Sequence, residues 1–285
     1  MCSSDLITIP VEWETLNEEY KLVYNIKVRG LLGGHSGMEI HKERGNANKI
    51  ISRVLAFVKD ECDFRLALIE GGSKANAIPK NGLAKVALKE GDNQVFLRDI
   101  NVIEDMIQRE LSSSDPDFEL VVEKLDEKVD KIFSENSFNK VIAALTLIPT
   151  GVQSMSMDIE GLVESSNNLA IVEIKEDSVI ITSTLRSSKG SLRENIAKKI
   201  KVVADIVEGT WESYGAYPAW EFKEESEIRE IFKKVYKEQF GEELAISAIH
   251  AGLECGLFDE KFEGKMDMIS FGPNMQDVHT TNEKV

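Results

Sequence analysis

Hydrophobic and polar positions alternate along the first part of the chain in a way that predicts strands and helices in turn. Strand-like alternation is found in four segments, residues 20–30, 64–70, 83–89 and 117–124. The segment after the first strand has apolar residues at three- and four-residue spacings, as on one face of a helix: Ile50, Ile51, Val54, Leu55 and Val58. With a second helix near 97–111, the order becomes β-α-β-β-α-β, the split βαβ or ferredoxin-like arrangement.

A similar order of elements partly repeats further along the chain. The patterns predict a helix over 136–146, strands over 169–174 and 178–185, a helix over 191–207 and a closing strand near 209–215. The repeat lies in the order of elements only, because the two halves share no evident sequence identity.

The pattern changes from about residue 221. A helix is predicted over 226–240, ending at Gly241, with an inward face formed by Ile228, Ile231, Phe232 and Val235. Strands over 243–249 and 266–271, with a short helix after 251, have the rhythm of a doubly wound sheet. So short an α/β segment would leave most of its sheet unpaired, so we expect it to be part of a larger domain.

The charge balance narrows the classes of partner. Lys and Arg total 34 and Asp and Glu total 50, which gives a net charge of −16 and disfavours nucleic-acid phosphates and anionic membranes. No run of about 18 apolar residues predicts a membrane-spanning helix, and the first residues do not resemble a secretory signal. The widely separated Cys2, Cys62 and Cys255 indicate neither a disulfide framework nor a structural zinc site, so we expect a cytoplasmic protein.

Two histidines lie in segments where they could bind a metal or take part in catalysis. His279 follows the predicted strand 266–271, and the carboxyl end of a strand is where open α/β sheets bind ligands. With Asp277 nearby it could bind a metal, although an ordinary exposed loop histidine fits equally well. His35 lies in the glycine-rich segment LLGGHSGMEIH, where an imidazole could donate a hydrogen bond to a reacting carbonyl. A tight turn with an incidental histidine is the simpler explanation.

For four further residues, the sequence allows both a functional and a purely structural explanation. His250 and Glu254 are four residues apart and would share one face of a helix. Arg186 ends a predicted strand and suits bidentate binding of a carboxylate, although strand-end arginines are commonly surface residues. Asn76 precedes a proline-bearing turn, and turn chemistry alone explains it. These residues alone describe an acidic α/β protein with one candidate metal ligand and do not define its function.

Six segments taken together resemble one family of peptidases. In chain order they are GLLGGHSGMEIH, GNANKII, GGSKANAIP, GAYPAW, HAGLECGLF and GP…H…NEKV. They resemble the Xaa-His dipeptidases, also called aminoacyl-histidine dipeptidases or peptidase D. These are co-catalytic zinc peptidases related to aminoacylase and glutamate carboxypeptidase. GGHSG is shared across the wider family, whereas HAGLECG and GAYPxW are more specific, and the resemblance runs over essentially the whole chain.

The resemblance implies a division of the chain into three parts. Residues 1–14 would end the N-terminal part of a catalytic α/β domain, residues 15–220 would form a lid of ferredoxin-like units, and residues 221–285 would return to the catalytic domain. The expected fold class is therefore α/β, with an α+β lid and an incomplete piece of a doubly wound domain.

The resemblance also implies roles for individual residues. His279 matches the last ligand of a pair of zinc ions, which manganese or cobalt can replace, and His35 matches the histidine that steadies the developing oxyanion. Asn76 and Arg186 match positions that hold the substrate's free carboxylate, and His250 and Glu254 lie in the segment that lines the substrate pocket. The family's other metal ligands, a His-x-Asp, a bridging Asp and a Glu-Glu pair with the general base, have no match in this sequence.

We therefore expect a fragment of a cytosolic zinc-dependent dipeptidase that hydrolyses Xaa-His dipeptides with a metal-activated water, and we expect this chain alone to be inactive. Its partners would be a small peptide substrate and a second copy in a homodimer, with no nucleic acid and no membrane. One alternative is a non-catalytic lid-type module for dimerisation or peptide binding. Another keeps the enzyme but changes the substrate, to a broader dipeptidase or a related deacylase.

Overall fold

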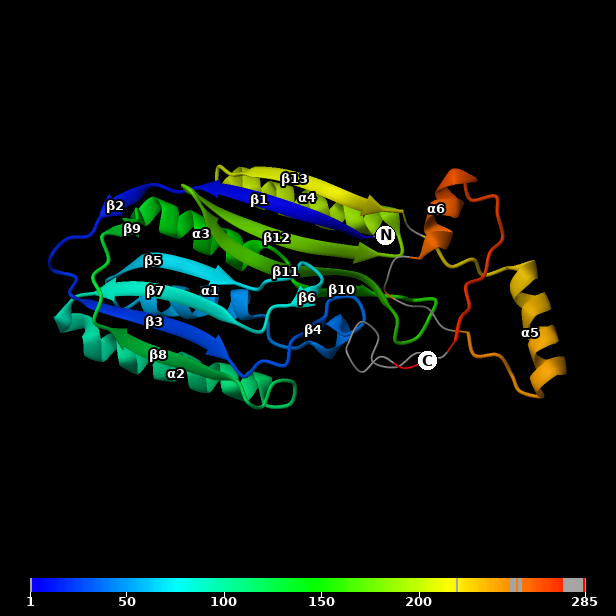
Figure 1. Cartoon of the computed structure of the whole chain (residues 1–285), viewed down its shortest axis with the longest axis horizontal. Helices are drawn as coiled ribbons and strands as arrows, with labels where there is room; N and C mark the ends of the chain where they lie inside the picture. Colours follow the sequence, from blue (N-terminus) through cyan, green and yellow to red (C-terminus); the bar gives the residue numbers. More distant parts are fainter. Residues whose placement is uncertain (1, 219, 247–249, 251–252, 274–283, 285) are drawn as a thin grey trace.

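Most of the chain forms one large antiparallel sheet with helices on a single face. A computed structural model describes residues 2–218, 220–246, 250, 253–273 and 284. The helices between residues 47 and 206 lie behind the sheet in the view of Figure 1, and those between residues 227 and 261 lie beyond one of its ends.

The strands of this chain are β1 (Cys2–Pro10), β2 (Trp13–Thr15), β3 (Leu22–Arg29), β4 (Gly34–His35), β5 (Phe64–Gly71), β6 (Ala77–Ile78), β7 (Gly82–Leu88), β8 (Glu119–Leu125), β9 (Lys131–Phe133), β10 (Gly151–Met155), β11 (Val163–Lys175), β12 (Ser178–Ser187) and β13 (Thr210–Tyr217). The helices are α1 (Ala47–Lys59), α2 (Asn93–Leu111), α3 (Glu135–Leu147), α4 (Gly190–Ile206), α5 (Glu227–Phe240) and α6 (Glu254–Lys261), with short 3-10 helices η1 (Ile40–Lys42) and η2 (Glu90–Asp92). The large sheet has the order β13-β1-β12-β11-β5-β7-β3-β8, and β10 pairs with β11.

The first half of the sheet is the predicted ferredoxin-like unit. Its strands lie in the order β5-β7-β3-β8 with neighbouring strands antiparallel, and α1 and α2 make the two crossovers. Asn46 caps the start of helix α1, and its side chain accepts hydrogen bonds from the amides of Asn48 and Lys49. The apolar stripe predicted for this helix is buried in the main core. The β-α-β-β-α-β prediction is confirmed.

Strand β11 joins the second half of the sheet to the first. The side-chain amides of Asn46 and Asn48 donate to the carbonyl of Leu169 at 3.0 and 3.4 Å, at the point where the register between β11 and β12 shifts. Strand β12 pairs with β1, and β1 pairs with β13. Residues 1–14 were expected to end a separate domain, whereas β1 lies inside the large sheet because its alternate residues are buried against the helices.

Helix α5 starts and stops as predicted but does not bury the face expected of it. Ser226 accepts a hydrogen bond from the Arg229 amide at its start, and Gly241 ends it with φ of 73°. Three of the four side chains expected to face inward are exposed, Ile228 by 40%, Ile231 by 55% and Val235 by 49%, whereas Phe232 is half-buried and its ring centroid lies 4.9 Å from that of Phe271.

The two strands expected near the C-terminus are not seen. Residues 243–246 and 266–271 are not in strands, and residues 247–249 lie outside the described part of the chain. A strand needs a neighbour for its backbone groups, and the described residues of this segment offer none. Asp267 instead accepts hydrogen bonds from Ser226 and from the Ile228 amide at the start of α5. The doubly wound sheet is therefore not formed by the residues described.

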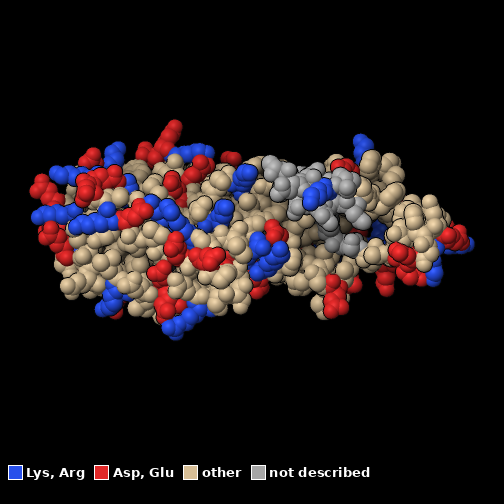
Figure 2. Space-filling model, turned by 60° about the horizontal axis from the view of Figure 1, so that its bottom comes forward, with Lys and Arg blue, Asp and Glu red and all other residues tan. Residues whose placement is uncertain are grey.

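Helices cover one face of the large sheet, and the surface charges of the sheet region are mixed. Helices α2, α1, α3 and α4 pack side by side on one face and enclose the main hydrophobic core. In Figure 2, Lys and Arg are interspersed with Asp and Glu over the visible surface of the sheet region, so the net negative charge forms no single acidic patch there. None of the helices described is both long and apolar enough to cross a membrane.

Candidate functional site

The candidate site lies on the helix-free face of the sheet, in the paired strands β11 and β12. Arg186 lies directly opposite Ser166, and Thr184 lies opposite Asn168, so these four buried side chains share one face. The segment before β7 covers them. The Thr184 hydroxyl donates to the carbonyl of Ala75 at 2.6 Å, and the side-chain amide of Asn168 donates to the carbonyl of Ala77 at 2.8 Å.

His35 is held in a short ribbon over the same face. Strand β4 pairs with β6, which places His35 opposite Ala77. The amides of Gly37 and Met38 donate to His35 Nδ1 at 3.2 and 3.1 Å. Because Nδ1 accepts these hydrogen bonds, the proton of the neutral ring lies on Nε2. His35 therefore presents Nε2–H as its side-chain hydrogen-bond donor.

Gly37 is the point at which the His35 segment meets Arg186 and His250. A Cβ atom at residue 37 would lie 2.7 Å from the carbonyl oxygen of His250 and 3.1 Å from both Cζ and Nη1 of Arg186. Only glycine allows so close an approach. Three segments that are far apart in the sequence therefore converge on one backbone position.

Arg186 and His250 give this place the character of an anion site. Arg186 is 8% exposed, its Nε has no hydrogen-bond partner, and it makes no ion pair within the described residues. A buried guanidinium without an acceptor is costly, and its planar fork suits a carboxylate. His250 Nε2 lies 2.7 Å from the Ser166 hydroxyl. Burial, followed by the charge of Arg186, lowers the pKa of His250 to about 4, so His250 is neutral at pH 7.

The other predicted site residues are placed differently. Asn76 is exposed and adjoins the site through its carbonyl, which accepts a hydrogen bond from the Ser36 amide at 2.9 Å. Glu254 is exposed as the first residue of α6, whereas His250 precedes that helix, so the two do not share a helix face as expected. His279 lies outside the described residues. Within the described ranges, no three His, Cys, Asp or Glu side chains gather as a metal ion would require.

The polar face of β11 was missed by sequence reasoning. This strand begins at Val163, but its first part contains the run ESSNN (164–168), which lacks apolar alternation, so the predicted strand starts at 169. These polar residues are buried by different neighbours: the Asn168 amide donates to the carbonyl of Ala77 beside β6, and the Asn167 amide donates to the carbonyl of Pro149 at 2.6 Å. The available signal was the tract of small polar residues leading directly into an apolar strand.

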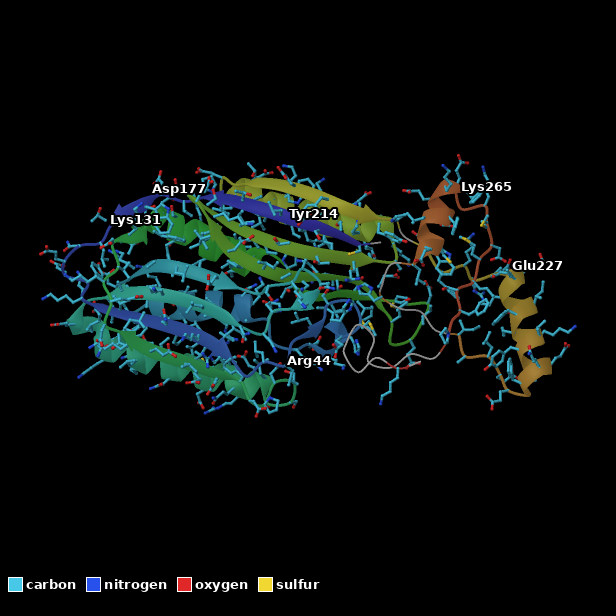
Figure 3. All side chains as sticks on the ribbon, viewed as in Figure 1. Arg44, Lys131, Asp177, Tyr214, Glu227 and Lys265 are labelled. Carbon is cyan, nitrogen blue, oxygen red and sulfur yellow. The ribbon has the colours of Figure 1, made fainter. Side chains whose placement is uncertain are left out.

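The segment that carries His35 is stabilised by its own charges. One carboxylate oxygen of Glu39 accepts a hydrogen bond from the His35 amide at 2.9 Å. The other lies 2.9 Å from Lys42 and 3.2 Å from Arg44, whose guanidinium also donates to the carbonyl of Gly33. Figure 3, in which Arg44 is labelled, shows this segment on the side of the sheet toward α5 and α6. The Lys42 ammonium and the His35 amide lower the pKa of Glu39 to about 2.

Replacing Glu39 by Gln is expected to destabilise the protein by about 1–2 kcal/mol at pH 7, after allowance for its partial exposure. Because the pKa of Glu39 in the folded chain is about 2, below its ordinary value of 4.5, the ionised carboxylate stabilises the fold above pH 4.5. This contribution is lost as the pH falls through about 2. Urea unfolding of the protein and the variant at pH 7 and pH 3 should therefore give a smaller difference at pH 3. The control is Glu70→Gln, at an exposed residue of β5, and an equal Glu39 effect at both pH values would contradict the prediction.

The chain is similar to known peptidases. A family model described as the peptidase dimerisation domain matches residues 26–115, which run from β3 to just beyond α2. The cytosol non-specific dipeptidase of Escherichia coli (strain K12) is 31% identical over 281 residues, which cover 99% of this chain and 56% of the relative. The crystal structure of aminoacylhistidine dipeptidase from Vibrio alginolyticus matches with a TM-score of 0.92 and 34% identity, over 99% of this chain and 57% of that one. The predicted resemblance is confirmed, and the chain spans little more than half the length of these relatives.

Proposed function

Because the chain resembles these dipeptidases over almost its whole length, we propose that it forms the substrate-binding part of a cytoplasmic Xaa-His dipeptidase. In this proposal residues 15–220, with β1 as a further strand of their sheet, are the lid, and residues 221–285 belong to the catalytic domain. The observation that carries the proposal is the convergence of His35, Arg186 and His250 at Gly37. A group that binds carboxylate and a neutral imidazole donor then lie together, as the cleavage of a short peptide requires.

Each residue has a distinct part in this proposal. Arg186 and the side chain of Asn76 bind the free carboxylate of the peptide, which fixes the position of its last residue. The Nε2–H of His35 donates to the carbonyl oxygen of the bond to be cleaved and stabilises the negative charge that develops there. His250 and Glu254 line the pocket, and His250 stays neutral, so that it does not add a second charge beside Arg186.

The described residues contain no cluster of metal ligands, and the predicted ligand His279 lies outside them. We assign to them the binding and orientation of the peptide. When bound, a zinc pair (or manganese or cobalt in its place) supplies a hydroxide at neutral pH. We propose that His279 is one ligand and that the others, with the general base, come from outside this chain. The chain alone is then expected to be inactive.

The test is to measure the hydrolysis of Gly-His and Gly-Leu by the complete protein and by this chain alone. The proposal expects the complete protein to cleave Gly-His in preference and the chain alone to cleave neither. Equal rates for the two dipeptides would indicate a broader dipeptidase and not one specific for Xaa-His. The name of the Escherichia coli relative favours this alternative. A related deacylase would instead cleave N-acylated amino acids.

The match to a peptidase dimerisation domain favours a homodimer and keeps a non-catalytic module as the second candidate. Within this unit the edge of β5 is already paired with β11, whereas β8 ends the large sheet. We propose that a second copy binds along β8. Dimers in sedimentation together with no hydrolysis of any dipeptide by the complete protein would favour the non-catalytic module.

A further inference from the structure

Asp115 is a buried acid that the proposed reaction does not use. It lies in the turn between α2 and β8, is 1% exposed, and makes no ion pair with any described residue. Burying a carboxylate is costly unless its oxygens receive hydrogen bonds. Both oxygens of Asp115 do receive one. Oδ1 accepts from the amide of Leu32 at 2.8 Å, and Oδ2 accepts from the amide of Gly45 at 2.7 Å.

These two amides are the two ends of one loop. Residues 32–45 leave the sheet after β3, carry His35 and η1, and return at the start of α1. The base of the loop is tightly packed, since a Cβ at Gly45 would lie 2.7 Å from Leu31 and 3.0 Å from Leu111. One side chain from a distant part of the sequence therefore closes the loop at its base.

A carboxylate is suited to this position in a way that other side chains are not. It offers two acceptor oxygens in one plane, so it can receive two amides that approach from different directions. An asparagine has the same shape but replaces one acceptor with an NH₂ group, which would face a backbone N–H and repel it. The identity of the residue therefore matters, as well as its size.

We propose that Asp115 is a positioning residue that fixes His35 by holding both ends of the loop 32–45. The inference rests on the proposed role of His35 in peptide cleavage. Within the loop, Glu39 and the pairing with β6 hold His35, and Asp115 holds the two ends of the loop. Asp115 ties the loop to the ferredoxin-like unit itself.

The first test measures hydrogen exchange in this chain, and it requires no activity. In Asp115→Asn, amides of the segment 32–45 should exchange at least tenfold faster, while those of β3 and β7 keep their rates. The matched control is Asp117→Asn, an exposed residue of the same turn, which should leave exchange unchanged. Unchanged exchange in the 32–45 segment of Asp115→Asn would overturn the proposal.

The second test is a double-mutant cycle in the complete protein. Asp115→Asn should lower kcat about tenfold with little change in KM, and it should have no further effect when His35 is already Ala. An equal fall in both backgrounds would show a general structural role and would overturn the assignment. If His35→Ala alone left kcat unchanged, the proposed function of His35 would fail, whereas the exchange measurement would still decide whether Asp115 holds the loop.

Discussion

Replacing His35 by Ala in the complete protein is expected to lower kcat for Gly-His by a hundredfold to a thousandfold, with KM nearly unchanged. The ring accepts hydrogen bonds at Nδ1 from Gly37 and Met38, so it is kept as a neutral donor at Nε2. A donor whose hydrogen bond to the carbonyl oxygen strengthens only as negative charge develops there stabilises the transition state and not the bound peptide. The loss of one such donor typically costs about 3–4 kcal/mol.

The matched control for this experiment is His41→Ala. His41 lies in the same loop, in η1, and its side chain is exposed. This variant should keep kcat within a factor of about two, since exposed substitutions rarely have larger effects. A His35→Ala enzyme with normal kcat would exclude the oxyanion role.

Replacing Arg186 by Met is expected to lower kcat/KM for dipeptides about a hundredfold, mainly through KM. Methionine fills much of the same buried volume but offers no donor to a carboxylate. Hydrogen bonds between charged groups contribute about 1.5–3 kcal/mol each, so a loss of about 3 kcal/mol is a conservative expectation for a bidentate pair. A loss of that size corresponds to roughly a hundredfold in binding.

The sharper measurement for Arg186 uses Gly-His and its C-terminal amide. The unaltered protein should prefer the free carboxylate strongly, and Arg186→Met should treat the two substrates alike. Arg109→Met, at an exposed residue of α2, serves as the control and should keep the preference. A preference that survives in Arg186→Met would mean that another group binds the carboxylate.

The regular elements of this fold were largely predictable because local patterns determine them. The stripe from Ile50 to Val58 specifies α1 wherever it packs, and Ser226 and Gly241 set the ends of α5 through local capping, by the Ser226 hydroxyl at the start and the left-handed Gly241 at the end. The strands at 243–249 and 266–271 were predicted from the same kind of pattern. The second is not formed, since a strand depends on a partner that its own sequence does not specify.

The candidate site was predictable only in part, and for a related reason. The roles of single residues such as His35 and Arg186 were predicted from the resemblance and not from their spacing in the sequence. Their meeting at Gly37 depends on which face of β12 carries Arg186 and on how the β4–β6 ribbon lies across it. Ser166 and Asp115 act through contacts with residues far away in the sequence, and no local pattern marks them.

The position of β1 has a consequence for how the chain matures. Residues 2–10 leave the ribosome well before their partners in the sheet, which are residues 178–186 and 210–217. At about 5–20 residues per second, this segment waits roughly 10–40 s before both neighbours exist. During that time its apolar residues, Leu6, Ile7 and Ile9 among them, have no sheet to enter. Strand β1 is thus synthesised long before the strands that order it, and the nascent chain depends on protection from aggregation until β13 has emerged.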